Sequence, residues 1–119
     1  MKTNELRIGN LVYRNTFKGD VVFKVEEIRK NCVVCKNDNA PLKTLNPIPL
    51  TEDILLKCGF EKFAQVWYRH KTSGFEFALS GLIATNSYFG CFPVDCCNYL
   101  HQLQNLYFAL TNEELNIEL

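Results

Sequence analysis

The clearest pattern of hydrophobic and polar positions lies between Val94 and Leu119. Apolar residues recur there at the spacing of one helical face: Cys96, Leu100, Leu103, Tyr107 and Leu110. Asp95 is a candidate N-cap, and Asn112 can adopt the left-handed conformation that ends a helix. Beyond Asn112, apolar and polar residues alternate as far as Leu119. The pattern predicts a long two-faced helix followed by a half-buried strand at 115–119.

The first fifty residues follow the period of two that is typical of strands. We expect strands at Leu11–Tyr13, Val21–Ile28 and Cys32–Cys35, with polar turns at 15–20 and 37–41. The second strand should bend where two glutamates interrupt the alternation, and the prolines after residue 45 should keep the chain extended. These features predict an antiparallel meander that resembles a small SH3-like barrel.

A short helix and a second meander are expected next. Thr51, followed by two acidic residues, is typical of a helix start, and Gly59 of a helix end. Further strands are expected at 63–68, 75–79 and within 82–92. This order of elements predicts an α+β fold with antiparallel sheets. We expect residues 1–119 to form a single domain, with a barrel-like subdomain at 1–50 and the remaining elements at 51–119.

The composition is that of a globular protein. The 119 residues are 47% hydrophobic and 22% charged, and their net charge is zero. No apolar run approaches the roughly 20 residues of a membrane span, and the first residues lack the apolar stretch of a secretion signal. We therefore expect a cytoplasmic protein without membrane contact. Nine basic and five acidic residues precede residue 46, against four and eight after it, but the basic residues are dispersed rather than clustered.

Candidate chemistry is limited to one pair of cysteines. Cys32 and Cys35 have the two-residue gap of half a zinc site, but the two valines between them favour an extended chain, which points the thiols to opposite faces. In a reducing compartment the six cysteines are expected to be free thiols. No nucleophile, base and orienting group come together in the sequence, and no phosphate-binding loop is present. We expect no enzyme activity and no cofactor, with zinc binding as an alternative.

Two clusters combine aromatic and basic residues, a mixture typical of surfaces that bind proteins or nucleic acids. The first consists of Tyr13, Arg14, Phe17 and Lys18, and the second of Trp67, Tyr68, Arg69 and His70. Strand alternation should bury one of Trp67 and Tyr68. On one shared face, the two clusters would form the chain's candidate nucleic-acid surface. The polar side of the last helix, with His101, Gln102 and Asn105, is a further candidate partner surface.

Three blocks of the sequence resemble a family of small uncharacterised proteins of Bacteroides-type bacteria and their prophages or mobile elements. They are Asn4–Val12, Pro47–Phe60 without its central residues 53 and 54, and His101–Leu115. In that family glycine often stands at the position of Asn112, which fits a left-handed helix end. The resemblance implies a phage or mobile-element context, does not include the cysteines, and implies no activity.

Taken together, these observations predict a small non-enzymatic binding or adaptor protein. A protein partner or self-association is expected, because small barrels and exposed strand edges are common docking surfaces and the net charge is balanced. Nucleic-acid binding is an alternative that rests on the aromatic and basic clusters. Zinc binding, or the blocking of a host defence system, is a further alternative; the second is suggested by the mobile-element context alone.

Overall fold

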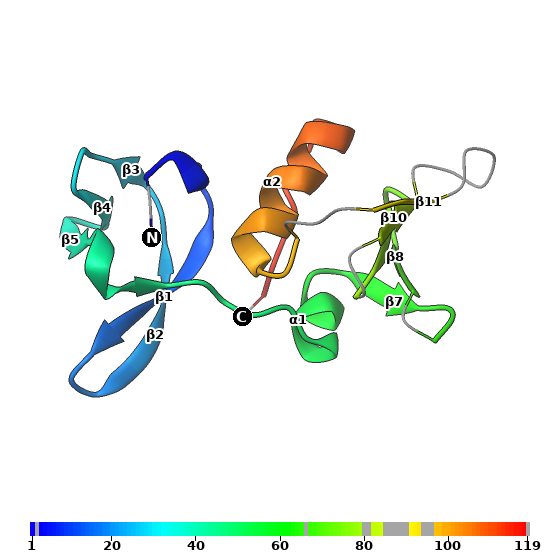
Figure 1. Ribbon diagram of the computed structural model, residues 1–119, viewed down its shortest axis with the longest axis horizontal. Helices are drawn as coiled ribbons and strands as arrows, with labels where there is room; N and C mark the ends of the chain where they lie inside the picture. Colours follow the sequence, from blue (N-terminus) through cyan, green and yellow to red (C-terminus); the bar gives the residue numbers. More distant parts are fainter. Residues whose placement is uncertain (2, 66, 80–81, 85–90, 94–96, 119) are drawn as a thin grey trace. The chain divides into compact units, whose positions relative to one another are not determined.

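The computed structural model describes residues 1, 3–65, 67–79, 82–84, 91–93 and 97–118 (Figure 1). Its elements, in chain order, are η1 (Thr3–Glu5), β1 (Leu11–Thr16), β2 (Gly19–Lys24), β3 (Glu27–Ile28), β4 (Cys32–Cys35), β5 (Asp38–Pro41), η2 (Leu42–Thr44), β6 (Leu45–Asn46), α1 (Glu52–Lys57), β7 (Phe60–Lys62), β8 (Trp67–His70), β9 (Glu76–Ala78), β10 (Leu82–Ala84), β11 (Cys91–Pro93) and α2 (Leu100–Thr111). The fold is α+β with antiparallel sheets, as predicted.

The chain divides into two compact units. The N-terminal unit consists of Met1–Pro49 together with Tyr99–Asn105, and the C-terminal unit consists of Leu50–Asn98 together with Leu106–Leu119. Helix α2 therefore contributes its first half to one unit and its second half to the other. Within the described residues, neither helix is long and apolar enough to cross a membrane.

The N-terminal unit contains two small antiparallel sheets formed by its described strands. One has the strand order β2-β1-β6 and the other β3-β4-β5. Their inward side chains form one core, because alternate residues of a strand point to the same face. This core consists of Leu6, Val12, Phe23, Val25, Val33, Ala40 and Leu45. The described strands do not close into one barrel, so the SH3-like barrel stays a prediction.

A bulge links the first sheet to the segment before it. Gly9 has a φ of 98°, which favours glycine, and it donates its backbone N–H to the carbonyl of Val25 at 2.7 Å. Val25 in turn donates its N–H to the carbonyl of Asn10 at 2.9 Å. Two residues thus oppose one, which is the pattern of a β-bulge that begins with glycine. The bonds of Val25 also show which β2 residues direct their backbone groups toward β1.

The C-terminal unit contains a five-stranded antiparallel meander, counted over the described residues, with the order β11-β10-β9-β8-β7. Helix α1 precedes it and has the predicted ends. The Thr51 hydroxyl accepts the N–H of Ile54 at 3.2 Å, and Gly59 takes a φ of 87° just after the helix. Leu55 of α1 and its C-cap residue Cys58 have buried side chains. In the second half of α2, the Tyr107 ring packs on Phe75 with centroids 5.4 Å apart.

The long helix differs from the prediction at its start. It begins at Leu100, because Tyr99 forms an isolated bridge with Pro49 and its N–H is accepted by the Gln102 side chain at 3.1 Å. The predicted start at residues 94–96 lies outside the described residues. Leu100, Leu103 and Tyr107 are buried as predicted. The prediction for Leu110 was wrong, because this residue lies in the last turn and is 49% exposed.

The end of α2 is confirmed, but the strand after it is not. Asn112 has a φ of 60° and donates its N–H to the carbonyl of Phe108 at 2.8 Å, as expected for a left-handed helix end. Residues 114–118 form no strand. The alternation there is explained by the buried side chain of Leu115, and Glu118 makes a backbone bond to Lys57 at 3.3 Å. Leu119 lies outside the described residues.

Two turns also lie elsewhere than predicted. The first turn is formed by Lys36 and Asn37, whose φ values of 50° and 66° suit a two-residue hairpin, so that Asp38–Pro41 forms strand β5. In the second unit, the predicted strand at 63–68 is interrupted. Phe63 donates its N–H to Trp67 at 3.1 Å across a turn, which separates β7 from β8. The polar residues at 37–41 thus correctly predicted a hairpin after β4, but the turn is shorter than predicted and begins at Lys36.

Candidate partner-binding surface

The β1–β2 hairpin exposes an unusual amount of apolar surface. Phe17, at its tip, is 96% exposed, and the neighbouring Val21 and Val22 on β2 are 46% and 47% exposed. Seven large hydrophobic side chains are exposed among the described residues, and three of them lie on this one hairpin. Single exposed apolar residues are ordinary, but a local group of them marks a candidate binding surface.

The turn holds Phe17 away from the sheet. The Thr16 hydroxyl donates to the carbonyl of Gly19 at 2.7 Å and accepts the N–H of Lys18 at 3.2 Å. Gly19 supplies the φ of 109° that this turn requires. The Lys18 ammonium lies 5.7 Å from the centre of the Phe17 ring, within the range of a cation–π contact. The turn is therefore a defined structure and presents an aromatic ring beside a positive charge.

Strand β2 is an edge strand of its sheet, because it pairs with β1 on one side and is the outer member of the order β2-β1-β6. Val25 directs both its N–H and its carbonyl toward the β1 segment. In an antiparallel ladder the direction alternates along the strand, so Phe23 and Val21 also point inward. Asp20, Val22 and Lys24 consequently direct their backbone N–H and carbonyl groups away from the sheet.

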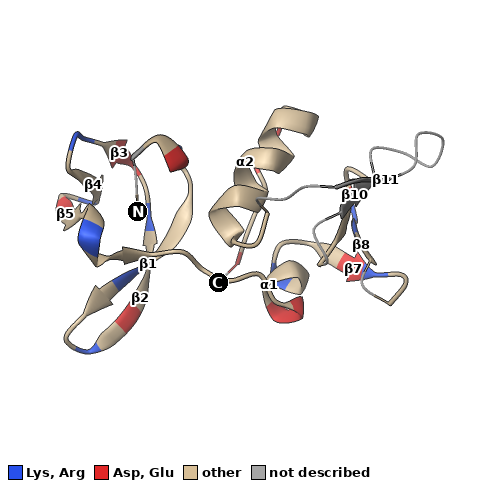
Figure 2. Ribbon diagram, viewed as in Figure 1, with Lys and Arg blue, Asp and Glu red and all other residues tan. Residues whose placement is uncertain are grey.

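A groove of about 620 Å³ runs beside β2. It is lined by residues of β1, β2 and the β4–β5 turn, among them Arg14, Val21, Phe23, Glu26, Lys36 and Asp38. Its walls carry fixed charges. Arg14 forms an ion pair with Asp38, and the Lys36 N–H is accepted by the Glu26 carboxylate at 2.6 Å. Figure 2 shows basic and acidic residues interspersed over this unit, without a region of one sign.

The structure places the first predicted cluster around this hairpin, but not on one face. Phe17 and Lys18 lie at the tip and are exposed. Tyr13 and Arg14 are adjacent in β1 and so point to opposite faces, and both are half-buried. The Arg14 guanidinium lies 5.7 Å from the Phe23 ring and is neutralised by Asp38. The exposed part of the cluster is therefore one aromatic ring and one cation, Phe17 and Lys18.

The second predicted cluster lies in the C-terminal unit. Tyr68 is buried and Trp67 is half-buried, which confirms the prediction that one of the two aromatics is in the core. Arg69 donates to the Glu76 carboxylate at 3.0 and 3.1 Å and stacks 4.4 Å from the Phe63 ring centre. The arginine of this cluster, like Arg14 in the first, is thus paired with a carboxylate.

His70 of the same cluster has a structural position. Its Nδ1 lies 3.0 Å from the Thr72 hydroxyl and 3.4 Å from the Tyr107 hydroxyl, and its ring meets Phe60 edge-on at 5.3 Å. Burial lowers the pKa of His70, while its hydrogen bond to the Cys58 backbone and the nearby Glu113 carboxylate oppose this shift. The imidazole is therefore held mainly in its neutral form at pH 7.

On the third predicted surface, along the last helix, the expected exposure of His101 was wrong. His101 is 2% exposed and stacks at 12° to the Tyr99 ring, so it does not reach the surface. The Gln102 side chain caps the Tyr99 N–H at 3.1 Å. Asn105 accepts the Asn10 side-chain amide at 2.8 Å. The side chains of Gln102 and Asn105 are half-buried, and each makes a hydrogen bond within the N-terminal unit.

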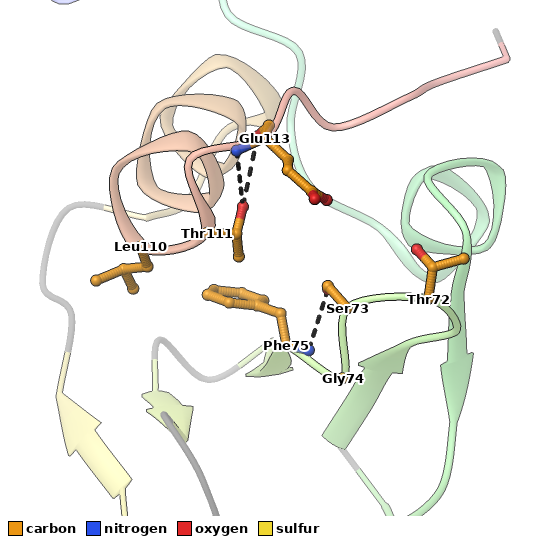
Figure 3. Close-up of a pocket in the computed structure, with 7 residues that line it drawn as sticks. All are labelled: Thr72, Ser73, Gly74, Phe75, Leu110, Thr111 and Glu113. Atoms are coloured by element: carbon orange, nitrogen blue, oxygen red, sulfur yellow. Dashed lines mark hydrogen bonds between the residues drawn. The ribbon is translucent and has the colours of Figure 1, made fainter.

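A second hollow, of about 560 Å³, lies in the C-terminal unit between the β8–β9 turn and the end of α2 (Figure 3). Figure 3 shows the Phe75 ring between the turn and Leu110. The hydroxyls that line the hollow are engaged by the chain itself. Ser73 accepts the N–H of Phe75 at 3.3 Å, and Thr111 donates to the carbonyl of Tyr107 at 2.7 Å.

The cysteine pair lies in strand β4. Cys32 and Cys35 stand at its two ends, are half-buried and are free thiols. Their positions differ by three, so the two side chains point to opposite faces of the strand. Over the part of the chain that the structure describes, no three His, Cys, Asp or Glu residues gather as a metal site.

The residues that the sequence did not single out are those along the outer edge of β2. They are Asp20, Val21, Val22 and Lys24. One signal was present in the sequence: two adjacent valines in a strand point to opposite faces, so both cannot lie on the core face. Only the sheet order shows that the edge beside them is open. In comparisons with protein-family models, curated proteins and solved structures, no match to this chain was found.

Proposed function

We propose that this protein is a small binding or adaptor protein that acts through protein–protein contacts, and that it takes an extended segment of its partner along the open edge of β2. The observation that carries the proposal is that no described strand pairs with the outer edge of β2, beside which Val21, Val22 and Phe17 are exposed. In strand addition, backbone hydrogen bonds supply affinity and alternate side chains supply specificity. The groove beside β2 accommodates side chains on the inner face.

Nucleic-acid binding has less support. The arginines of the two aromatic and basic clusters are each paired with a carboxylate, Arg14 with Asp38 and Arg69 with Glu76. Binding of a polyanion depends on cations that can neutralise phosphates. A cytoplasmic location and a phage or mobile-element context remain hypotheses that accompany the proposed adaptor role.

Site-specific photocrosslinking tests the proposal. A photoreactive phenylalanine analogue replaces Val22, and in a matched control it replaces Leu110, which is 49% exposed and lies in the C-terminal unit. In cells that express the protein naturally, we expect an adduct with a polypeptide from position 22 and none from position 110. Equal adducts from both positions, or none from position 22, would overturn the proposal.

An edge-blocking variant sharpens the test. The N–H of Lys24 points away from β1, so Lys24→Pro removes a donor of the edge without removing a bond of the sheet. The variant should keep the melting temperature of the original chain to within a few degrees and lose the adduct from position 22. Retention of the adduct in a folded Lys24→Pro protein would show that the partner does not bind by strand addition.

A further inference from the structure

The open edge of β2 is complementary to itself. We propose that β2 pairs in antiparallel orientation with β2 of a second copy of this chain, about a two-fold axis that passes beside Val22. The proposal rests on the proposed function, of which it names the partner. It follows from three properties of the edge: the direction of its backbone groups, the order of its charges and the exposure of its two valines.

The backbone groups determine which registers are possible. Because the backbone groups of Val25 point toward β1 and the direction alternates along the strand, the N–H and carbonyl groups of Asp20, Val22 and Lys24 point outward. With the axis at Val22, each outward residue faces another outward residue. Val22 faces Val22 of the second copy, and Asp20 faces Lys24. The two strands can then form a regular ladder.

The charges select this register from its neighbours. Asp20 lies opposite Lys24 of the second copy on both sides of the axis. The ladder ends there, because Glu26 already donates its N–H to the carbonyl of Val34 and Lys18 lies in the turn before β2. A shift by two residues in one direction places Lys24 opposite Lys18. A shift in the other direction places Lys24 opposite Val22 and forms no pair of opposite charges within β2. Opposite charges across a strand pair stabilise it, and like charges destabilise it, so the register centred on Val22 is favoured over these two.

The exposed valines account for the remaining surface. Val22 lies on the outer face of the sheet and would pack against its own symmetry mate. Val21 lies on the inner face, where this register places it opposite Phe23 of the second copy, over the groove beside β2. In the single chain, nearly half of the surface of each valine is exposed to water. Pairing would cover them, which favours association through the hydrophobic effect.

A second copy fits this edge better than an unrelated strand because the order of charges along the edge is self-complementary. The outward positions of β2, from Asp20 to Lys24, are negative, apolar and positive, and this order is its own complement when reversed. A two-fold dimer requires such a self-complementary surface, because if residue i of one copy contacts residue j of the other, residue j of the first copy also contacts residue i of the second. The paired sheet would have the order β6-β1-β2-β2-β1-β6.

Charge reversal tests the proposal in the full-length chain. Sedimentation of the unmodified protein over a wide range of concentration should show a monomer–dimer equilibrium. Asp20→Lys places two like-charged pairs in the interface, and so does Lys24→Asp. Each variant should weaken dimerisation by about tenfold or more. Both positions are exposed, so circular dichroism should show unchanged folding.

Mixing the two variants identifies the contact. In a dimer of one Asp20→Lys chain and one Lys24→Asp chain, both cross-strand pairs again join opposite charges, so the mixture should regain the dimer that neither variant forms well. Controls are Glu61→Lys and Lys71→Asp, which carry the same charge changes on exposed positions of the C-terminal unit. These should dimerise as the original chain does, separately and when mixed.

The outcomes separate this proposal from the proposed function. A protein that is monomeric at every concentration, or a mixture that does not regain the dimer, overturns pairing through β2. If Val22 still gives an adduct with a different polypeptide, and Lys24→Pro removes it, the adaptor function stands with another partner. If neither dimer nor adduct is observed, both proposals fail.

Discussion

The amide oxygen of Gln104 in α2 accepts the backbone N–H of Leu11, the first residue of β1, at 2.8 Å. The amide nitrogen of the same side chain donates to the carbonyl of Gly9 at 3.0 Å. Gln104 is 2% exposed, so these two bonds are made in the interior of the N-terminal unit. One side chain of helix α2 thus satisfies two backbone groups beside the β-bulge, although the helix lies more than ninety residues further along the chain.

Replacement of Gln104 by leucine should destabilise the protein. The volume is similar, but the N–H of Leu11 and the carbonyl of Gly9 lose their partners, which costs about 1–3 kcal/mol for a buried group left unsatisfied. Urea unfolding should show a lower midpoint for Gln104→Leu. The same change at the exposed Gln65 should leave the midpoint nearly unchanged. Equal effects at the two positions would contradict the role of these bonds.

The two histidines should respond in opposite ways to replacement by leucine. Within the described residues, neither ring nitrogen of the buried His101 has a hydrogen-bond partner. His101→Leu therefore removes a desolvation cost and should leave the melting temperature unchanged or higher. His70→Leu removes the contact of Nδ1 with the Thr72 hydroxyl and should lower it. Calorimetry of the two variants compares them, and a large loss for His101→Leu would show that this imidazole is bonded after all.

Stability should also fall in mildly acidic solution. Burial lowers the pKa of both His70 and His101 below the ordinary 6.5, while the Glu5 carboxylate opposes the shift of His101. The unfolded chain then binds more protons than the folded chain just below pH 6.5. The stabilisation is complete above pH 6.5 and is lost as the pH falls through the folded-state values. Thermal melts across this interval should show the loss, with a smaller slope for His101→Leu.

The end of α2 offers a stabilising substitution. Asn112 holds a φ of 60°, which costs a residue with a Cβ about 1 kcal/mol or more, and asparagine somewhat less. Asn112→Gly should raise the unfolding midpoint, whereas Asn112→Ala should lower it by the equivalent of about 1 kcal/mol. Asn116→Gly, at an exposed position outside the helix, is the control and should not stabilise. A gain of the same size at position 116 would contradict the helix-end explanation.

The thiol of Cys58 should be unreactive in the folded protein. Burial raises its pKa to about 12, so the nucleophilic thiolate is scarce at neutral pH. Peptide mapping after iodoacetamide treatment should show Cys58 labelled only when the chain is unfolded. Cys32, which is half-buried, provides the comparison and should label earlier. Equal rates of labelling for the two cysteines in native protein would contradict this expectation.

The sequence predicted the ends of helices correctly where a capping residue or a residue suited to positive φ lies at the end itself. Thr51 and Gly59 delimit α1 because a hydroxyl cap and a glycine at positive φ act within a few residues. Asn112 ends α2 for the same reason. The start of α2 could not be read from the sequence, because the pairing of Tyr99 with Pro49 connects residues fifty positions apart. Such pairings depend on the tertiary fold rather than on a neighbouring side chain.

The candidate surface was predicted only at its tip. Phe17 and Lys18 lie in a turn that the sequence marks, and their exposure follows from that turn. The importance of Asp20 and Lys24 depends on β2 being the outer strand of its sheet, which no property of the strand itself reveals. His101 was expected on the surface because its helical neighbours are polar. One of those neighbours, Gln104, is itself buried and bonds to the backbone of Leu11, so a polar neighbour did not mark a surface position here.

The unequal edges of the first sheet limit how far strand addition can proceed. On the side opposite β2, the sheet ends at β6, which has two residues, Leu45 and Asn46. So short a strand offers too few backbone groups to act as a template for another chain. A sheet built in this way can grow in one direction and by one step, so that pairing through β2 ends in a closed pair and not in a fibril.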